Sequence, residues 1–516
     1  MMSLNTTLRR LARVALIVPF VVALPAAGQS VINEDLKLTA GGVSSVAISG
    51  TTAILGASGA GPGQACLFGT TTGQQIMYLA DIDDPDSFGE AFGSSVGISG
   101  NFAIVGDPLG NDAGPNSGTA HLFDITDTAA DLTLIHIQLS ASDSGANSRF
   151  GSSVAISGHT AIVGAPSAIG SNLVVSGAAY LFEINTDNCS RPPCPPGSSS
   201  AAQSFKLIPL DGANGDAFGW SVAISGTTAI VGARSHNGGS GAAYLFSTTT
   251  GQQMAKLTAF DAASGDRFGG SVAISATTAI VGTSSGSAYL FDVSVPSSPV
   301  QGAKLTTSDG SGPTSVAIHG TKAVVGTPFG DGGGSSSGSA YVFDIITGQQ
   351  LAKLAASDAA ADDFFGSGVA MSDTTLMVDT YVFDGSTINI LQQPQNNLVL
   401  PGETVPLNVE AANAGAIESY QWRRDGVDLI DGAGVSGTNT PNLQVVATES
   451  EVGLYDCVIT RSPFFLGGLA LSTATDQVIL AVRPDPDACY PDANGDGVLN
   501  FFDVSQFIIE FGRGCP

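Results

Sequence analysis

Short apolar runs separated by small polar residues make up most of this chain. The clearest set lies between residues 205 and 246 and reads FKLI, FGWSVAISG, TAIVGA and GAAYLF. Each run is short, is rich in β-branched and aromatic residues, and is bounded by Gly, Ser, Thr or Asn. That pattern is typical of β-strands joined by tight turns. It predicts an all-β protein in which only the two ends of the chain show helical periodicity.

One of these runs, Ser-Val-Ala-Ile-Ser or a close variant, occurs seven times. Its valine falls at Val46, Val96, Val154, Val222, Val272, Val316 and Val369. The spacings of 44 to 68 residues fit one four-stranded blade per copy. Seven nearly equal copies without a distinct capping repeat favour a closed ring over an open solenoid, and closure hides most sheet edges. We therefore predict a seven-bladed β-propeller over residues 33–387.

A Phe-Gly pair precedes five of the seven copies, at residues 92–93, 150–151, 218–219, 268–269 and 365–366. Together with the Ala161-Ile-Val-Gly-Ala-Pro type of run, these pairs resemble the FG-GAP repeats that build the β-propeller of integrin α-subunits. The first and sixth copies have Gly41-Gly42 and Gly312-Pro313 instead, so we expect those two blades to pack more loosely. The seventh copy lacks a last strand, and we expect Leu36-Lys-Leu-Thr to supply it.

The resemblance also implies a calcium loop in each blade, but the residues do not support one. Integrin-type repeats often carry an Asp-x-Asp/Asn-x-Asp-Gly type of loop before the Gly-Ala-Pro turn. The matching places here read Ser-Gly-Thr-Thr, Ser-Gly-His-Thr or Ser-Gly-Asn-Phe, without a carboxylate. Calcium needs several oxygen ligands. No calcium is therefore expected in the propeller.

Residues 388–483 differ in composition and resemble an immunoglobulin-like β-sandwich. The resemblance assigns Trp422 to the core of strand C and Tyr455 to the tyrosine corner, with Cys457 two residues later. The expected partner position on strand B, near Leu407 to Val409, has no cysteine, so the usual inter-sheet disulfide is not expected. Such sandwiches often act as spacers.

The tail, residues 484–516, contains the strongest chemical signal. Oxygen ligands fall at positions 1, 3, 5, 9 and 12 of a loop that begins at residue 492, a backbone carbonyl serves at position 7, and Gly497 permits the sharp turn. The predicted Ca²⁺ ligands are Asp492, Asn494, Asp496, Val498, Asn500 and Asp503. An apolar stripe at helical spacing follows and predicts a short helix. The alternative is an acidic turn at a disordered terminus.

An EF-hand has Glu at position 12, whereas Asp there and Asn at position 9 resemble a dockerin loop. The Gly514-Cys515 ending resembles the GC-type dockerin variant. Dockerins usually have two such loops and this chain has one. The resemblance implies calcium-dependent folding and an anchoring role, with a cohesin-like or envelope protein as partner.

The first residues of the chain indicate an exported protein, whose six cysteines can then pair. Residues 1–28 combine Arg9, Arg10 and Arg13, an apolar run and small residues suited to cleavage, which predicts a signal peptide. The apolar run is shorter than the roughly 20 residues of a membrane span. We predict disulfides that join Cys189 to Cys194 and Cys489 to Cys515, while Cys66 and Cys457 are expected to be small buried hydrophobes.

The charge of the chain excludes nucleic acid as a partner. Without the signal peptide, the chain has 15 Lys plus Arg against 45 Asp plus Glu, a formal charge of −30. Such a surface repels phosphates and suits a soluble extracellular protein. We therefore expect a secreted or cell-surface protein with no transmembrane segment after signal cleavage.

Candidate catalytic patterns have simpler explanations. The sequence from Gly93 to Gly97 matches Gly-x-Ser-x-Gly, but it lies in the second copy of the structural repeat. The five histidines (His121, His136, His159, His236 and His319) are scattered without a metal-ligand motif. The acidic run from Asp81 to Asp86 is typical of a solvated face. We expect no enzymatic activity.

Three functions fit these features. The first is a surface adhesion or scaffold protein whose propeller binds an unknown protein or glycan, whose sandwich acts as a spacer and whose tail is a calcium-dependent anchor. The second is a dockerin-bearing component of an extracellular polysaccharide-degrading assembly. The third is a purely structural envelope protein. Only two tryptophans are present, Trp220 and Trp422, and this scarcity argues against glycan binding and favours the first.

Overall fold

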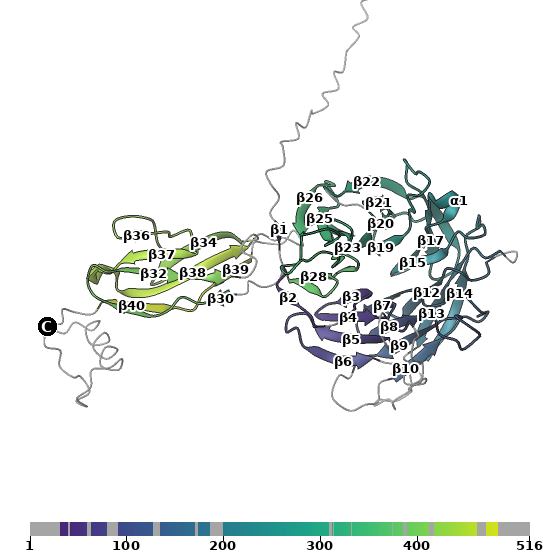
Figure 1. Ribbon diagram of the computed structural model, residues 1–516, viewed down its shortest axis with the longest axis horizontal. Helices are drawn as coiled ribbons and strands as arrows, with labels where there is room; N and C mark the ends of the chain where they lie inside the picture. Colours follow the sequence, from purple (N-terminus) through teal and green to yellow (C-terminus); the bar gives the residue numbers. More distant parts are fainter. Residues whose placement is uncertain are drawn as a thin grey trace, which may run out of the picture.

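The computed structural model describes most of the repeat region and of the sandwich (Figure 1). The described residues are 31–32, 34–39, 42–58, 63–79, 91–126, 135–170, 174–185, 200–308, 312, 314–331, 333–373, 375–384, 390–411, 417–461 and 471–482. The predicted signal peptide, the calcium ligands of the tail and Cys189, Cys194, Cys489 and Cys515 lie outside these ranges.

Seven antiparallel sheets form the repeat region, and Figure 1 shows them around a ring, as in a β-propeller. The first sheet holds β3 (Ser45–Ser49), β4 (Thr52–Ala57), β5 (Gln64–Gly69) and β6 (Gln75–Leu79). The second holds β7 (Ser95–Ser99), β8 (Phe102–Asp107), β9 (Thr119–Asp124) and β10 (Ile135–Leu139). The third holds β11 (Ser153–Ser157), β12 (Thr160–Ala165), β13 (Ala178–Asn185) and β14 (Ser200–Leu207).

The later sheets repeat this order. The fourth holds β15 (Phe218–Ser225), β16 (Thr228–Ala233), β17 (Ala242–Ser247) and β18 (Gln253–Leu257). The fifth holds β19 (Ser271–Ser275), β20 (Thr278–Gly282), β21 (Ser287–Asp292) and β22 (Val300–Thr306). The sixth holds β23 (Ser315–His319), β24 (Lys322–Thr327), β25 (Ser339–Asp344) and β26 (Gln350–Leu354), and the seventh β27 (Val369–Met371), β28 (Thr375–Val378) and β29 (Tyr381–Asp384).

The N-terminal segment completes the last two sheets. Strand β2 (Leu36–Lys37) pairs antiparallel with β29 and gives the seventh sheet its fourth strand, which confirms the prediction for Leu36 and Lys37. Strand β1 (Val31–Ile32) pairs parallel with β26, so the sheets include residues two positions before the predicted start of the repeat region. The two ends of the repeat region are thereby joined by backbone hydrogen bonds.

Apolar cores lie between neighbouring sheets. The second strand of the fourth sheet, β16, is buried over its whole length because other strands flank it and sheets cover both of its faces. One continuous core contains Leu181 of the third sheet together with Val222 and Phe246 of the fourth. Burial on both faces explains why these strands are continuous apolar runs rather than alternating ones.

Helix is almost absent from the described residues. A single turn, α1 (His236–Gly239), follows β16, and a 3₁₀ turn, η3, spans Glu449–Glu451. No helix of the described residues is long and apolar enough to cross a membrane.

The second unit consists of two packed sheets and a short ladder. The larger sheet contains β31 (Asn397–Val399), β40 (Val478–Val482), β38 (Gly453–Arg461), β34 (Ile417–Arg424) and β35 (Val427–Asp428), with β39 (Leu471–Ala474) beside β38. The smaller contains β32 (Thr404–Asn408), β37 (Asn442–Val446) and β36 (Val435–Ser436), and β30 (Ile390–Gln392) pairs with β33 (Glu410–Ala411).

The core of this unit contains the residues that the sequence singled out. Trp422 and Tyr455 are fully buried in one cluster with Leu407 and Leu443 of the smaller sheet. The Tyr455 hydroxyl donates to the carbonyl oxygen of Glu451 at 2.7 Å. Cys457 is a buried free thiol, and so is Cys66 in the first sheet, as expected for small buried hydrophobes.

Candidate functional site

One face of the ring carries the long connections. Because successive strands of each sheet are antiparallel, the connection from the second to the third strand and the link to the next sheet emerge on the same side. We call this side the connector face. In the fourth and fifth sheets it comprises residues 234–241, 258–270 and 283–286. Links and connections bond to one another, for example through the Arg267 amide, which donates to the Gly239 carbonyl oxygen at 2.9 Å.

The Phe-Gly pairs hold these links against the sheets. Phe218 is fully buried and its ring lies 5.6 Å from that of Tyr244, while its backbone bridges to Gly177 of the preceding sheet. Gly219 has φ +87°, and a Cβ there would lie 2.2 Å from the carbonyl oxygen of Ala178. Glycine is therefore required by both conformation and space. The pair is a packing device between neighbouring sheets.

The serine of the Gly-x-Ser-x-Gly match serves the same contact. Ser95 is buried in β7, and its hydroxyl donates to the carbonyl oxygen of Gly151 at 2.9 Å. Ser153, in the next sheet, makes the matching bond to Gly219 at 3.0 Å. This serine therefore has a structural role, which is a repeated hydrogen bond from one sheet to the next.

A repeated trio of side chains, which we call the Asp-Tyr-Lys clamp, connects a link to the sheet that follows it in four of the sheets, the third, fourth, fifth and seventh. In the third sheet, Tyr180 donates to one oxygen of Asp143 at 2.9 Å and Lys206 donates to the other at 2.5 Å. Three further clamps have the same geometry. They are Asp211 with Tyr244 and Lys256, Asp261 with Tyr289 and Lys304, and Asp358 with Tyr381 and Lys37.

The clamps keep their aspartates ionised. The hydrogen bonds from Lys37 and Tyr381 hold the pKa of Asp358 below its usual value, and those from Lys304 and Tyr289 do the same for Asp261. Burial, followed by the charge of Asp143, raises the pKa of the Tyr180 hydroxyl. Each clamp is thus a charge-assisted network in which Lys and Tyr share one carboxylate.

The first sheet lacks the clamp. Cys66 occupies the place of the tyrosine, Tyr78 that of the lysine and Gly42 that of the aspartate. In the second sheet His121 and Gln138 replace Tyr and Lys. A signal for the clamp is present in the sequence. Each of β14, β18, β22 and β26 contains a Lys-Leu pair, and an Asp stands five residues after its Lys. Sequence reasoning missed it.

Two of the histidines expected to be scattered lie together, which corrects that expectation. His121 in β9 and His136 in β10 are in stacked contact, with Nδ1 of the first 2.8 Å from Nε2 of the second. They are neighbours because the two strands are paired. His236 instead contacts the clamp of the fourth sheet. Its Nδ1 donates to Asp216 at 2.8 Å, and its Nε2 accepts from the clamp residue Lys256 at 2.7 Å.

The connector face carries exposed apolar side chains and a stacked arginine. Leu210 and Phe260, each directly before a clamp aspartate, are 85% and 75% exposed. In the sixth sheet and the link that follows it, Phe329 and Phe364 are partly exposed and form an edge-to-face pair with ring centroids 5.4 Å apart. Between Leu210 and Phe260 in the chain, the Arg234 guanidinium stacks on Trp220, and its central carbon lies 3.1 Å from the ring centroid. Such side chains are typical of binding surfaces.

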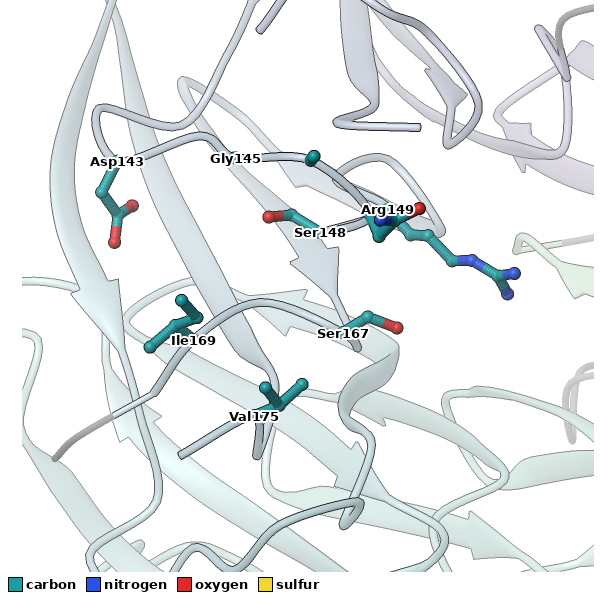
Figure 2. A pocket seen from close by; sticks show the side chains of 9 residues that line it. Asp143, Gly145, Ser148, Arg149, Ser167, Ile169 and Val175 are labelled. Atoms are coloured by element: carbon teal, nitrogen blue, oxygen red, sulfur yellow. The ribbon is translucent and has the colours of Figure 1, made fainter. Parts of the chain in front are cut away.

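A hollow of about 590 Å³ lies on this face beside the third sheet (Figure 2). Asp143 lies at one side, Ile169 and Val175 form an apolar wall, and the Arg149 side chain points away from the hollow. Residues 145–148 and Ser167 complete the lining, mostly with backbone and small side chains. The hollow offers shape and hydrogen-bonding groups, and its one carboxylate is already held by Tyr180 and Lys206.

The described part of the chain contains no group of three or more His, Cys, Asp or Glu side chains arranged to hold a metal. The predicted calcium ligands from Asp492 to Asp503 and both predicted disulfides lie outside the described residues, so they stay predictions. The acidic run from Asp81 to Asp86 also lies outside them.

Comparison with protein-family models matches the FG-GAP repeat six times, at residues 83–123, 137–182, 202–246, 252–291, 299–343 and 349–388. These ranges correspond to the second to seventh sheets, and the first sheet, which lacks the Phe-Gly pair and the clamp, is not matched. The match confirms the FG-GAP resemblance. A search of curated proteins finds no match.

Proposed function

We propose that this FG-GAP repeat protein is an exported binding protein, with a seven-bladed integrin-α-like propeller as its ligand platform, an immunoglobulin-like sandwich as a spacer and a calcium-ordered tail as an anchor. The observation that carries the proposal is the asymmetry of the ring. Long connections with exposed Leu, Phe and Arg side chains lie on the connector face. The connections on the opposite face are mostly short turns.

Seven sheets and their closure support the blade count. Every described sheet of the ring has the same order of strands, and β2 completes the last one. A closed ring is rigid because each sheet packs on two neighbours. Rigid elements that present variable loops are suited to binding.

The sandwich has the hallmarks of an immunoglobulin-like domain. Trp422 is buried between the sheets, and Tyr455 bonds to the backbone four residues upstream, as a tyrosine corner does. The absence of a cysteine near Leu407 leaves Cys457 as a buried thiol. Apolar packing and hydrogen bonds, such as that from the Trp422 indole N–H to the Thr440 carbonyl oxygen at 2.8 Å, hold the two sheets together in the described residues.

The anchoring role rests on the tail sequence. Carboxylate, amide and backbone oxygens at the spacing of Asp492, Asn494, Asp496, Val498, Asn500 and Asp503 suit calcium. The same loop supports the alternative function, a dockerin-bearing component of an extracellular polysaccharide-degrading assembly, in which the propeller would bind carbohydrate.

Selection of ligands on the full chain tests the binding role. Displayed random peptides and an array of polysaccharides are presented to the protein and to two variants. One variant, Leu210→Ser with Phe260→Ser, alters the connector face, and the other, Val295→Ser with Ile346→Ser, alters exposed residues of the opposite face. We expect peptide ligands that lose binding only to the first variant. Polysaccharide ligands with the same dependence favour the alternative. Ligands that bind both variants as tightly as the wild type contradict the proposal that the connector face is the binding surface.

A further inference from the structure

Cations are scarce on this acidic chain, and most of those in the ring are already engaged. Lys37, Lys206, Lys256 and Lys304 bind the clamp aspartates, and Lys322 binds Asp344 at 2.8 Å. Three arginines differ from them. Arg149, Arg234 and Arg267 make no ion pair with a carboxylate in the part of the chain that the structure describes, and all three lie on the connector face.

Arg234 is held in a fixed orientation. Its guanidinium stacks on the ring of Trp220, which lies in β15 directly after the Phe-Gly pair. Stacking uses the face of the guanidinium and leaves the N–H groups at its edge available for a carboxylate. The Arg234 side chain is half-buried, so little conformational freedom remains to be lost on binding.

Arg267 is the neighbour of Arg234 across the next link. Its amide donates to Gly239, in the connection that begins at Arg234, and its side chain is exposed. Burial, followed by the like charge of Arg267, lowers the pKa of the Arg234 guanidinium. A bound anion would relieve that repulsion.

Carboxylates close to this pair in the fold have other partners. Asp216 binds the His236 ring and the Ala213 amide, and Asp266 accepts from the Ala263 amide at 2.7 Å. Asp211 and Asp261 belong to clamps. None of these carboxylates forms an ion pair with Arg234 or Arg267 in the described part of the chain.

We propose that Arg234 and Arg267 bind carboxylates of an acidic peptide segment on a protein partner, an inference that rests on the proposed binding role of the connector face. A peptide fits better than an acidic polysaccharide because Leu210 and Phe260 stand exposed on the two links beside the arginines. Trp, Phe and Arg around an apolar patch are the composition of protein interfaces. The net negative charge of the chain disfavours acidic ligands at places without such an arginine pair.

Titration of the full chain with a fluorescent oligoglutamate, at constant calcium, tests the inference. Oligoglutamine and oligogalacturonate serve as uncharged and carbohydrate probes. We expect oligoglutamate to bind, and Arg234→Gln and Arg267→Gln each to weaken it about tenfold. The matched control, Val295→Glu with Ile346→Glu, changes the net charge as much as both arginine substitutions together but on the opposite face, and should bind like the wild type.

Thermal unfolding confirms that each variant is folded before it is compared. Equal oligoglutamate binding by wild type and arginine variants, or tighter binding of oligogalacturonate, overturns the inference. If selected peptides need Leu210 and Phe260 but are indifferent to the arginines, this inference fails while the binding role stands. If no ligand depends on the connector face, both fail.

Discussion

Closure of the ring by the N-terminal strand gives the sharpest prediction on stability. Leu38 follows β2 directly, is 1% exposed and packs in the core that joins Val46 of the first sheet to Val382 of the seventh. Its amide also donates to the Thr380 carbonyl oxygen at 2.8 Å. Leu38→Ala removes three carbons, about 2.4 kcal/mol of transfer free energy, and leaves a cavity, so we expect a loss of about 2–5 kcal/mol.

Urea unfolding followed by circular dichroism measures this loss in the transition of the repeat region. The control is Leu210→Ala, in the same ring but 85% exposed, which should change the free energy of unfolding by less than about 0.5 kcal/mol. If Leu38→Ala unfolds at the same urea concentration as Leu210→Ala, residues 36–38 do not close the ring and the placement of β2 is wrong.

Four further predictions concern the clamps, the Phe-Gly turn and the tail. Tyr180→Phe removes the bond to Asp143 and should cost about 1 kcal/mol in urea unfolding, whereas Tyr78→Phe, in the sheet without a clamp, should cost little. The lowered pKa of Asp358 means that its clamp stabilises the fold fully above the unfolded-state pKa of about 4, and that this contribution is lost as pH falls through the folded-state pKa. Melting temperatures from pH 7 to pH 2 should show this loss, and Asp358→Asn should make the melting temperature depend less on pH. Gly219→Ala should destabilise the fold by more than about 1 kcal/mol, because φ is positive and the new Cβ would lie 2.2 Å from the Ala178 carbonyl oxygen. Gly226→Ala, where φ is +55° and no atom lies near the new Cβ, should destabilise the fold less. Differential scanning calorimetry compares the two variants. Calcium titration of the full chain by calorimetry should show saturable binding that Asp492→Ala with Asp496→Ala abolishes, and no heat from the wild type at millimolar calcium would refute the calcium loop.

Much of the fold could be predicted because it repeats. The apolar runs around Val222 predict strands, the seven copies predict the number of sheets, and the missing strand of the last copy predicts the role of Leu36 and Lys37. In the sandwich, Trp422 and Tyr455 were recognisable from their spacing to Cys457. Local pattern and repetition are sufficient for these features.

The candidate site could not be predicted in the same way, because its contacts join residues far apart in sequence. Asp143 binds Lys206, 63 positions away, and Asp358 binds Lys37 across 321 positions. The sequence shows Lys and Asp five residues apart, but those two belong to successive clamps. Likewise, the pairing of β9 with β10 brings His121 to His136. The pairing of β15 with β16 brings Arg234, which follows β16, onto Trp220.

Hydrogen–deuterium exchange of the full chain, with and without a selected ligand, tests the role of the connector face most directly. Residues 234–241 and 258–270 form part of the connector face, and exposed residues there, such as Gly265 and Arg267, donate their amides to the Gly239 carbonyl oxygen. A bound partner should slow the exchange of such exposed amides. We predict protection in these two segments. Protection confined to the opposite turns, such as residues 293–299, or to the sandwich would contradict a binding platform on the connector face.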